Sequence, residues 1–433
     1  MNIFEKIIIV TICVILPKSI REAVINRVKR TKNVFLSTFE LKILSKILKI
    51  ILFPLSIIIA LMIALIKIFF IWILPTKKYN DYRYLINQFY TDIIHKNMNV
   101  KLAFKRVCLC YELFTKGAER KVSFGEKNPE LTFYVLRPYY FLERNELVMN
   151  VSNLLFHYYR NLEHLAYGVE KGWIPVVDWK NYGPFAHQEN YPINGTKNCW
   201  EYYWNQPSNF TLEEVYQSKN VILSVQNTRD NSFVPSCFFR TPLQKQAEDY
   251  ARRCPKYDKL ITLNEITAKY IDEKEKDIFP NDARILGVSI RGTSYGNSSS
   301  LTNVNGHPIQ PDLVKLLKNV EILINEWNMD YIFITCELES VIEAFKAKFG
   351  DKILYLKRLR YKTAPQRGDV EKGLDPLYVP GQKYKTNLDY LTEMVLLSRC
   401  TSLAAAMSSG VRAAIIWNNR RYENMKIFEN GLW

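Results

Sequence analysis

Short apolar runs alternate with segments of helical periodicity over the C-terminal third of this chain. From this pattern we predict strands at 285–290, 331–335 and 353–356, a buried apolar stretch at 402–406, and helices at about 311–326, 339–348 and 387–399. A helix between two strands carries the chain back across the sheet, so the strands run parallel. The alternation therefore predicts a doubly wound α/β domain built around a parallel sheet.

A similar but less regular pattern precedes residue 280. It predicts strands at 131–136, 173–178 and 220–225, and helices at about 148–170, 243–253 and 260–274. A Pro-Asn-Asp cluster at 280–282 marks a boundary between the two patterns. We therefore divide the chain into a helical region at 1–79, an α/β domain at 80–280 and a second α/β domain at 281–433.

An apolar run at residues 50–74 contains Lys67 as its only charge. As a helix rising 1.5 Å per residue it would be about 37 Å long, which is enough to cross a bilayer with some tilt. We expect a transmembrane anchor here, with Lys77 and Lys78 at its end. The alternatives are an interfacial helix hinged at Pro54 and a buried core helix.

Most of the net charge of +16 lies before residue 122, where 21 Lys and Arg accompany 7 Asp and Glu, against 38 and 36 in the rest of the chain. Because these basic residues flank apolar runs, we expect an anionic membrane surface as their partner and not nucleic acid. The eight Cys and five His show no zinc-binding or CxxC spacing, which predicts reduced thiols and no metal. Reduced thiols favour the cytoplasmic face of the membrane for the soluble part.

Polar residues follow three of the predicted strands of the C-terminal domain. They are Arg291, Gly292 and Thr293 after 285–290, Glu337 after 331–335, and Ser408, Ser409 and Gly410 after 402–406. Because the carboxyl ends of parallel strands meet at one edge of a sheet, we expect these residues to lie close together. Guanidinium groups and the amides of a helix start bind phosphate oxygens. The sequence therefore predicts a site for the diphosphate of a nucleotide at this edge.

Each of these residues also has an ordinary structural interpretation. Ser408 could cap a helix, and Glu337 could be a solvated charge. His307, which lies shortly before the predicted helix at 311–326 and is a further candidate, could simply hydrogen-bond its own loop. The polar loop at 358–386 is long enough to indicate a functional segment. The chain lacks a Walker loop, GxGxxG, GxSxG and a convincing DxD pair, which argues against kinases, NAD enzymes, serine hydrolases and metal-dependent sugar transferases.

Four segments, in their order and spacing, resemble the fucosyltransferase-like superfamily: GVSIRGTSY, GHPIQP, YIFITCELESVIEAFKAKFGDKI and NLDYLTEMVLLSRCTSLAAAMSSGVRAAI. This superfamily includes α-1,6-fucosyltransferases, protein O-fucosyltransferases and bacterial capsule and lipopolysaccharide glycosyltransferases. The resemblance covers roughly 128–433 and implies a GT-B-like fold, in which two Rossmann-like halves face a cleft. It also implies inverting, metal-independent transfer from a GDP-sugar, typically GDP-fucose, to a glycan or lipid-linked acceptor, with no cofactor besides this donor substrate.

The resemblance also assigns residues. It places Arg291 where the family's arginine neutralises the leaving diphosphate, and Ser408 and Ser409 where hydroxyls contact the same phosphate. The resemblance also places Glu337 and Glu393 near acidic positions of the second and third family motifs.

The chain departs from the family at two positions, having Ser289 where a His is usual and Ser294 where bacterial members have Asp. The loop at 295–305 contains no carboxylate, so the base that accepts the acceptor's proton has to come from elsewhere. The candidates for this base are His307, Asp178, Glu163 and His164.

Two further questions stay open at the level of the sequence. The missing carboxylate makes a non-catalytic scaffold in a glycan-assembly complex the alternative to a membrane-attached enzyme. The aromatic side chains between residues 181 and 205 could stack on the faces of sugars or could fill a core.

Overall fold

The structure is a computed structural model, and it describes residues 120–137, 140–143, 146–149, 154–181, 187–224, 233–236, 238–291, 306–363, 377 and 381–432. The chain divides into two compact units, Met1–Thr115 and Lys116–Trp433. The expected anchor at 50–74 and the expected domain boundary at 79 lie outside the described residues. Among the helices that are described, none has the length and apolar character needed to cross a membrane.

The first sheet has four strands in the order β1-β6-β2-β5. Its strands are β1 (Arg120–Val122), β2 (Lys127–Leu136), β5 (Ile174–Val177) and β6 (Ser218–Leu223). Strands β5 and β6 pair with β2 in parallel, whereas β1 pairs with β6 in antiparallel fashion. The three strands predicted between residues 131 and 225 are thus confirmed, and the short edge strand β1 was not predicted.

The expected helix at 148–170 begins later than its periodicity suggested. Residues Glu146–Met149 form strand β4, which pairs in antiparallel fashion with β3 (Tyr140–Glu143). Helix α6 then runs over Leu154–Glu170. The apolar residues near 148 therefore belong to a hairpin. Over so few residues, the spacing of apolar side chains does not distinguish a strand of a hairpin from the first turn of a helix.

The second sheet has five parallel strands in the order β11-β10-β7-β8-β9. They are β7 (Ile285–Ser289), β8 (Tyr331–Thr335), β9 (Ile353–Leu354), β10 (Ser402–Ala405) and β11 (Met425–Ile427). The chain moves outward from β7 through β8 to β9, returns beside β7 as β10, and continues outward to β11. The predicted doubly wound parallel sheet is confirmed, and the edge strand β11 was not predicted.

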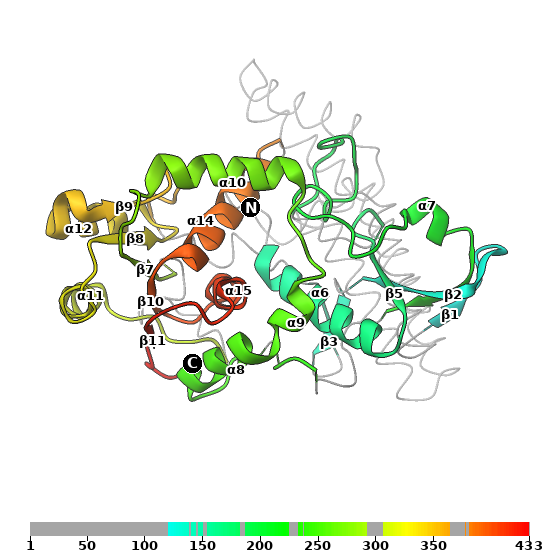
Figure 1. Ribbon diagram of the computed structural model, residues 1–433, viewed down its shortest axis with the longest axis horizontal. Helices are drawn as coiled ribbons and strands as arrows, with labels where there is room; N and C mark the ends of the chain where they lie inside the picture. Colours follow the sequence, from blue (N-terminus) through cyan, green and yellow to red (C-terminus); the bar gives the residue numbers. More distant parts are fainter. Residues whose placement is uncertain are drawn as a thin grey trace, which may run out of the picture. The chain divides into compact units, whose positions relative to one another are not determined.

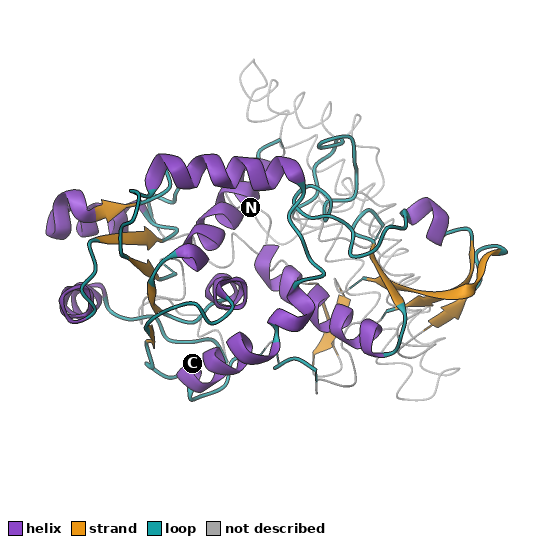
Figure 2. Ribbon diagram, viewed as in Figure 1, coloured by secondary structure: helices purple, strands orange, loops and turns teal. Residues whose placement is uncertain are grey.

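Helices cover both faces of this sheet (Figures 1 and 2). They are α11 (Leu313–Glu326), α12 (Glu339–Phe349) with the short 3-10 turn η1 (Gly350–Lys352), α14 (Lys383–Arg399) and α15 (Ser409–Asn418). Successive strand residues point to opposite faces. Leu286 and Val288 pack with α11 and α12, whereas Leu403 and Ala405 pack with α14 and α15.

The core on the α14 and α15 side continues into the first sheet. Tyr134 and Leu136 of β2 and the buried side of α6 belong to the same apolar cluster as Leu403 of β10.

The remaining helices are α7 (Leu212–Val215), α8 (Leu243–Arg253), α9 (Pro255–Asp258) and α10 (Glu265–Ile278). The helix predicted at 260–274 thus begins at 265, because the side chain of Asn264 caps it by accepting from the Thr267 amide.

Of the five aromatic residues that the structure describes between 187 and 205, four fill this core and Tyr191 is exposed. Trp200, Tyr202, Tyr203 and Trp204 are all buried, and Tyr203 stacks on Tyr384 of α14 with 5.6 Å between the ring centroids. Tyr202 and Tyr203 both contact Tyr384 of α14, and all four buried side chains belong to the core and are not exposed platforms for sugars.

Helix α14 begins at Lys383, four residues before its predicted start at 387. The carboxylate of Glu189 accepts hydrogen bonds from the backbone amides of Gly381 (2.8 Å) and Tyr384 (3.1 Å). A carboxylate at a helix start satisfies amides that have no partner within the helix and interacts favourably with the helix dipole. The cap comes from a residue about 190 positions away in the sequence, so no local pattern could indicate it.

Candidate functional site

Two of the polar residues predicted to share one edge of the sheet, Arg291 and Ser408, lie where the order of the strands reverses. Arg291 follows β7 and Ser408 follows β10, and these two strands are neighbours. Their ladder extends to this edge, where the Ala406 amide donates to the carbonyl of Ser289 at 3.0 Å. In open α/β sheets, ligands bind at the carboxyl ends of the strands on either side of such a reversal.

Two adjoining pockets open at this edge. The first is lined by Ser289, Ile290, Arg291, Thr335, Cys336, Glu337, Arg358, Tyr390, Glu393, Met394 and Ser408. The second is lined by Phe239, Arg291, His307, Pro308, Gln310, Met407, Ser408 and Ser409. Arg291 and Ser408 belong to both, so the structure brings together a guanidinium and a serine that are separated by 117 sequence positions.

The backbone and side chain of Arg291 are held from different directions. Its amide donates to the side-chain carbonyl of Gln310 at 2.9 Å, and Gln310 is itself buried. Its guanidinium Nε lies 3.8 Å from a carboxylate oxygen of Glu337, and both side chains are about one-quarter exposed. A pair at this separation and exposure is weak, so an anion entering the pocket can compete for the guanidinium.

The start of α15 supplies the second half of the pocket wall. Ser408 is its N-cap, and the Ser408 hydroxyl accepts a hydrogen bond from the Val411 amide at 3.2 Å. A Cβ atom at Gly410 would lie 2.5 Å from the Tyr390 hydroxyl and 2.6 Å from the Met394 sulfur. Gly410 thus allows α15 to approach α14 closely. Amides at a helix start and the helix dipole favour an anion there.

Glu393 is a buried member of a triad with two arginines. Its carboxylate oxygens lie 2.8 Å from Arg358 and 2.7 Å from Arg360, and all three side chains are at most 5% exposed. The triad carries one net positive charge, and Arg358 and Glu393 line the first pocket. With Arg291 and Glu337 added, these five described residues still carry a net charge of +1, which favours an anionic ligand.

Sequence reasoning did not name Gln310, Arg358 or Arg360. Gln310 lies within the quoted GHPIQP segment, and both arginines lie in the loop at 358–386 that the sequence marked as functional. The pocket also contains the thiol of Cys336, whose pKa burial raises to about 12, so this thiol stays protonated near neutral pH. A protonated thiol is a poor nucleophile.

The four candidate bases fall into two groups. His307 lines the second pocket with Arg291 and Ser408. Asp178 is fully buried at the end of β5 and accepts hydrogen bonds from Asn181 and from the Tyr216 hydroxyl.

The other two candidates lie on α6. Glu163 is buried and pairs with Arg160, and the Nδ1 atom of buried His164 lies 3.0 Å from the Tyr134 hydroxyl. Neither these two residues nor Asp178 line the pockets at Arg291. Of the four candidates, the structure brings only His307 to that edge of the sheet.

Gly292 and Thr293, together with Ser294 and the loop up to residue 305, lie outside the described residues. Across the part of the chain that is described, no three or more His, Cys, Asp or Glu side chains gather as they would around a metal ion.

No protein-family model matches this chain, and no curated protein matches it. It is similar to the solved structures of NodZ α-1,6-fucosyltransferase soaked with GDP-fucose (14% identity, TM-score 0.37) and of fucosyltransferase NodZ from Bradyrhizobium (13%, 0.36), each match covering 66% of this chain and 92% of the other. It is also similar to POFUT1 in complex with GDP-fucose (8%, 0.29), over 69% of this chain and 74% of POFUT1. Scores of this size do not establish a shared fold.

Proposed function

We propose that this protein is a glycosyltransferase that binds the diphosphate of a nucleotide-sugar between β7 and β10. The observation that carries this assignment is that Arg291 and Ser408 line the same pockets at the reversal of the strand order. The positive charge of the buried triad beside them supports it. Departure of the sugar leaves a diphosphate with additional negative charge, and fixed donors stabilise that charge without having to reorganise.

The residues of the site have separate parts in the proposed reaction. Arg291 would pair with the diphosphate, while Ser408, Ser409 and the first amides of α15 would donate hydrogen bonds to it. His307 would accept the proton of the attacking hydroxyl, since it lines the pocket next to Arg291. Inversion follows if that hydroxyl attacks the sugar from the side opposite the diphosphate.

The finer identity of the reaction comes from the sequence motifs. Their resemblance to fucosyltransferases favours a GDP-sugar, with fucose as the sugar and no metal, and a GT-B-like arrangement of the two sheets. The apolar run and basic region before residue 122 favour attachment to an anionic membrane surface. The expected reduced thiols favour its cytoplasmic face. The resemblance favours a glycan or lipid-linked acceptor.

Calorimetric titration of GDP into wild type and Arg291→Ala tests the diphosphate site. Loss of a charge-assisted contact worth about 1.5–3 kcal/mol should weaken GDP binding by roughly 10- to 100-fold. Arg399→Ala is the matched control, because Arg399 pairs with Asp272 and Glu275 of α10 and lines neither pocket. Equal affinity of the wild type and Arg291→Ala for GDP would remove Arg291 from this role.

A non-catalytic scaffold is the second candidate function. It is favoured by Ser289 and by the absence of any carboxylate from the loop at 295–305, where relatives often have their base. The scaffold would bind GDP without cleaving a GDP-sugar. Incubation of the protein with GDP-fucose, followed by chromatography of the released GDP, separates the two functions. Release that exceeds the non-enzymatic rate and disappears in Arg291→Ala would exclude the scaffold.

A further inference from the structure

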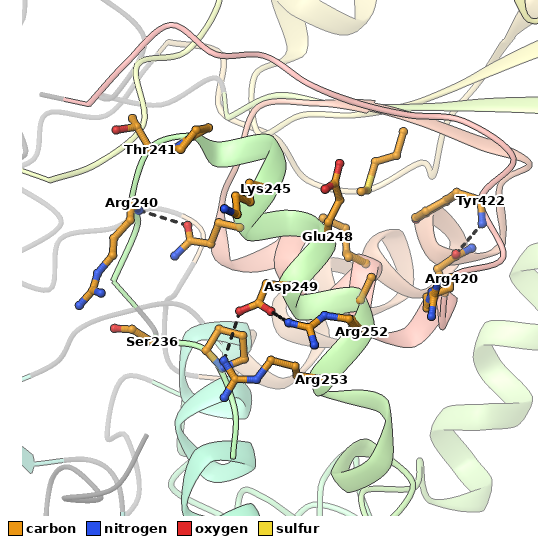
Figure 3. Close-up of a pocket in the computed structure, with 17 residues that line it drawn as sticks. Ser236, Arg240, Thr241, Lys245, Glu248, Asp249, Arg252, Arg253, Arg420 and Tyr422 are labelled. Atoms are coloured by element: carbon orange, nitrogen blue, oxygen red, sulfur yellow. Dashed lines mark hydrogen bonds and ion pairs between the residues drawn. The ribbon is translucent and has the colours of Figure 1, made fainter. Parts of the chain in front are cut away.

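A hollow of about 930 Å³ lies beside α8, with walls that also include the end of α15, the turn after it and the start of β11 (Figure 3). A volume of this size is in the range of sites that bind small organic ligands. The hollow is distinct from the proposed donor site. Helix α15 begins at the donor pockets and ends at the hollow, and its 10 residues span about 15 Å.

Positive charge dominates the lining of this hollow. The charged residues are Arg240, Lys245, Glu248, Asp249, Arg252, Arg253 and Arg420, five basic against two acidic. Asp249 is already paired with Arg252 and, at 3.2 Å, with Arg253 (Figure 3). Arg240, Lys245 and Arg420 are exposed, and their side chains make no ion pair with any residue that the structure describes. These three cations are therefore available to an anionic ligand.

The backbone at Arg420 suggests that its charge is used. Arg420 has a φ of 64°, directly after Asn419 with a φ of 52°. The Cβ atom of an L-residue makes this left-handed region cost roughly 1–2 kcal/mol, which Asn tolerates better than other residues and Gly avoids. Gly at this position would therefore give a more stable turn. An arginine at this position thus points to a role for the guanidinium that lines the hollow.

Apolar groups lie between the charges. The lining includes Pro235, Pro242, Met425 and the half-buried Tyr422, whose hydroxyl donates to the Leu397 carbonyl at 2.9 Å. A bare inorganic anion would leave these groups without contacts. A ligand that combines acidic groups with less polar faces, as a sugar ring does, can contact both kinds of surface.

We propose that this hollow binds an acidic oligosaccharide, whose carboxylates pair with Arg240, Lys245 and Arg420. Planar guanidinium groups match carboxylates in a two-bond geometry. The choice of a sugar chain over another anion rests on the proposed function. Because the hollow lies at the far end of α15 from the donor pockets, it holds a remote part of a long acceptor and not the reacting hydroxyl.

Calorimetric titration of the full-length protein with tetragalacturonate, an acidic tetrasaccharide, tests this site. We expect binding that weakens at least about tenfold in the Arg240→Glu/Lys245→Glu variant, since reversing two charges exchanges attraction for repulsion. Lys269→Glu/Lys276→Glu is the matched control, because both lysines are exposed on α10 and outside the hollow. It makes the same change in net charge and should bind like the wild type. Equal weakening by the two double variants would overturn the site, since binding would then follow net charge alone.

A third variant separates loss of binding from loss of folding. Arg420→Gly removes a charge at a position where the backbone favours glycine, so it should weaken tetragalacturonate binding severalfold without lowering the melting temperature. Unchanged affinity would contradict a role for Arg420. Arg291→Ala should keep the affinity for tetragalacturonate while losing GDP. Failure of the donor site and failure of this hollow therefore give different results.

Three comparison ligands check the class of the partner. Maltotetraose, a neutral tetrasaccharide, should bind at least tenfold more weakly than tetragalacturonate. Inorganic phosphate binding as tightly as the acidic tetrasaccharide would overturn the assignment to a sugar chain. A second result would also overturn it: the wild type binds phosphatidylglycerol vesicles but not tetragalacturonate, and Arg240→Glu/Lys245→Glu loses the binding to vesicles. The hollow would then be part of a membrane-binding surface.

Discussion

Arg291 and His307 occupy neighbouring positions in the site but have chemically different tasks. The guanidinium of Arg291 keeps its charge at any accessible pH, so it suits binding of a diphosphate but not transfer of a proton. An imidazole is both a donor and an acceptor near neutral pH. Both side chains line the second pocket, while the other three candidate bases line neither pocket. His307 is therefore the residue whose removal should affect turnover more than binding.

We expect His307→Gln to lower the rate of sugar transfer by roughly 10²–10⁴, the usual contribution of a general base. Its affinity for GDP should stay within about twofold of the wild type, because Arg291 and the start of α15 remain in place. Rapid-quench measurement of a single turnover with GDP-fucose, alongside GDP titration, separates the two quantities. Parallel loss of rate and GDP affinity would instead assign His307 to donor binding.

Glu393 shows how a residue of the pocket wall can act mainly through its partners. Replacing it with Gln removes the carboxylate that contacts both Arg358 and Arg360, and leaves the two buried positive charges in place. Breaking a buried ion pair on one side usually costs about 3–5 kcal/mol, so Glu393→Gln should lower the free energy of unfolding by about 3 kcal/mol. Urea denaturation measures this difference. Glu326→Gln, at an exposed position of α11, should change it by less than about 0.5 kcal/mol.

The elements of the second sheet could be predicted because each carries its signal locally. Strands β7 and β8 and helices α11 and α12 begin and end within two residues of the prediction. The predictions failed where distant residues decide the structure. Strand β11 is only three residues long and depends on pairing with β10, and the start of α14 depends on Glu189.

In the candidate site, too, the residues placed by local sequence patterns could be predicted, and those placed by distant contacts could not. Arg291, Glu337 and Ser408 could be predicted together because parallel strands place their carboxyl ends at one edge. The triad of Arg358, Arg360 and Glu393 could not, since an ion pair between residues 33 positions apart leaves no periodic pattern in the sequence. These ion pairs form only when α14 packs on the sheet and brings Glu393 beside the two arginines.

Helices α6, α9 and α15 meet at a partly buried polar contact. The Tyr158 hydroxyl donates to the carboxylate of Asp258 and accepts from the Trp417 indole at 3.0 Å. Burial raises the pKa of Asp258 from its ordinary 3.8 to about 6. The folded protein thus retains a proton that the unfolded chain releases between these pH values. Below pH 4 Asp258 does not lower the free energy of unfolding, because it is protonated in both states. As the pH rises from 4 to about 6, Asp258 lowers the free energy of unfolding increasingly, because only the unfolded chain releases the proton.

Asp258→Asn should remove that penalty, because the amide does not ionise and its carbonyl still accepts from Tyr158. The variant should match the wild type near pH 3.5 and exceed its stability by up to about 3 kcal/mol above pH 6.5, at about 1.4 kcal/mol per pKa unit. Urea titrations at a series of pH values measure the difference. Asp351→Asn, at an exposed position in η1, should show no such trend. A constant difference between Asp258→Asn and the wild type would contradict the raised pKa.

At the scale of the whole second unit, two separate sheets share a core. The division at residue 280 falls in the segment between α10 and β7, so it separates the sheets but not their apolar contacts. Arg412 of α15 is one of the residues that connect the two parts of this core. It is fully buried, and its guanidinium lies 4.5 Å from the Tyr159 ring of α6 and 5.0 Å from the Tyr250 ring of α8. Such stacking compensates a buried cation in part through the negative faces of the rings.

Because of this shared core, residues 281–433 should not fold as an independent domain. Without α6 and α8, the buried faces of α14 and α15 and the guanidinium of Arg412 lose their partners, and the exposed apolar surface binds hydrophobic dyes. We expect residues 116–433 to unfold in one cooperative transition that coincides in near- and far-ultraviolet circular dichroism. Residues 281–433 should instead bind the dye ANS and lack a sharp transition. A cooperative transition of the isolated fragment would show that the second sheet and its helices already contain a sufficient core, and that Arg412 is stable without the rings of Tyr159 and Tyr250.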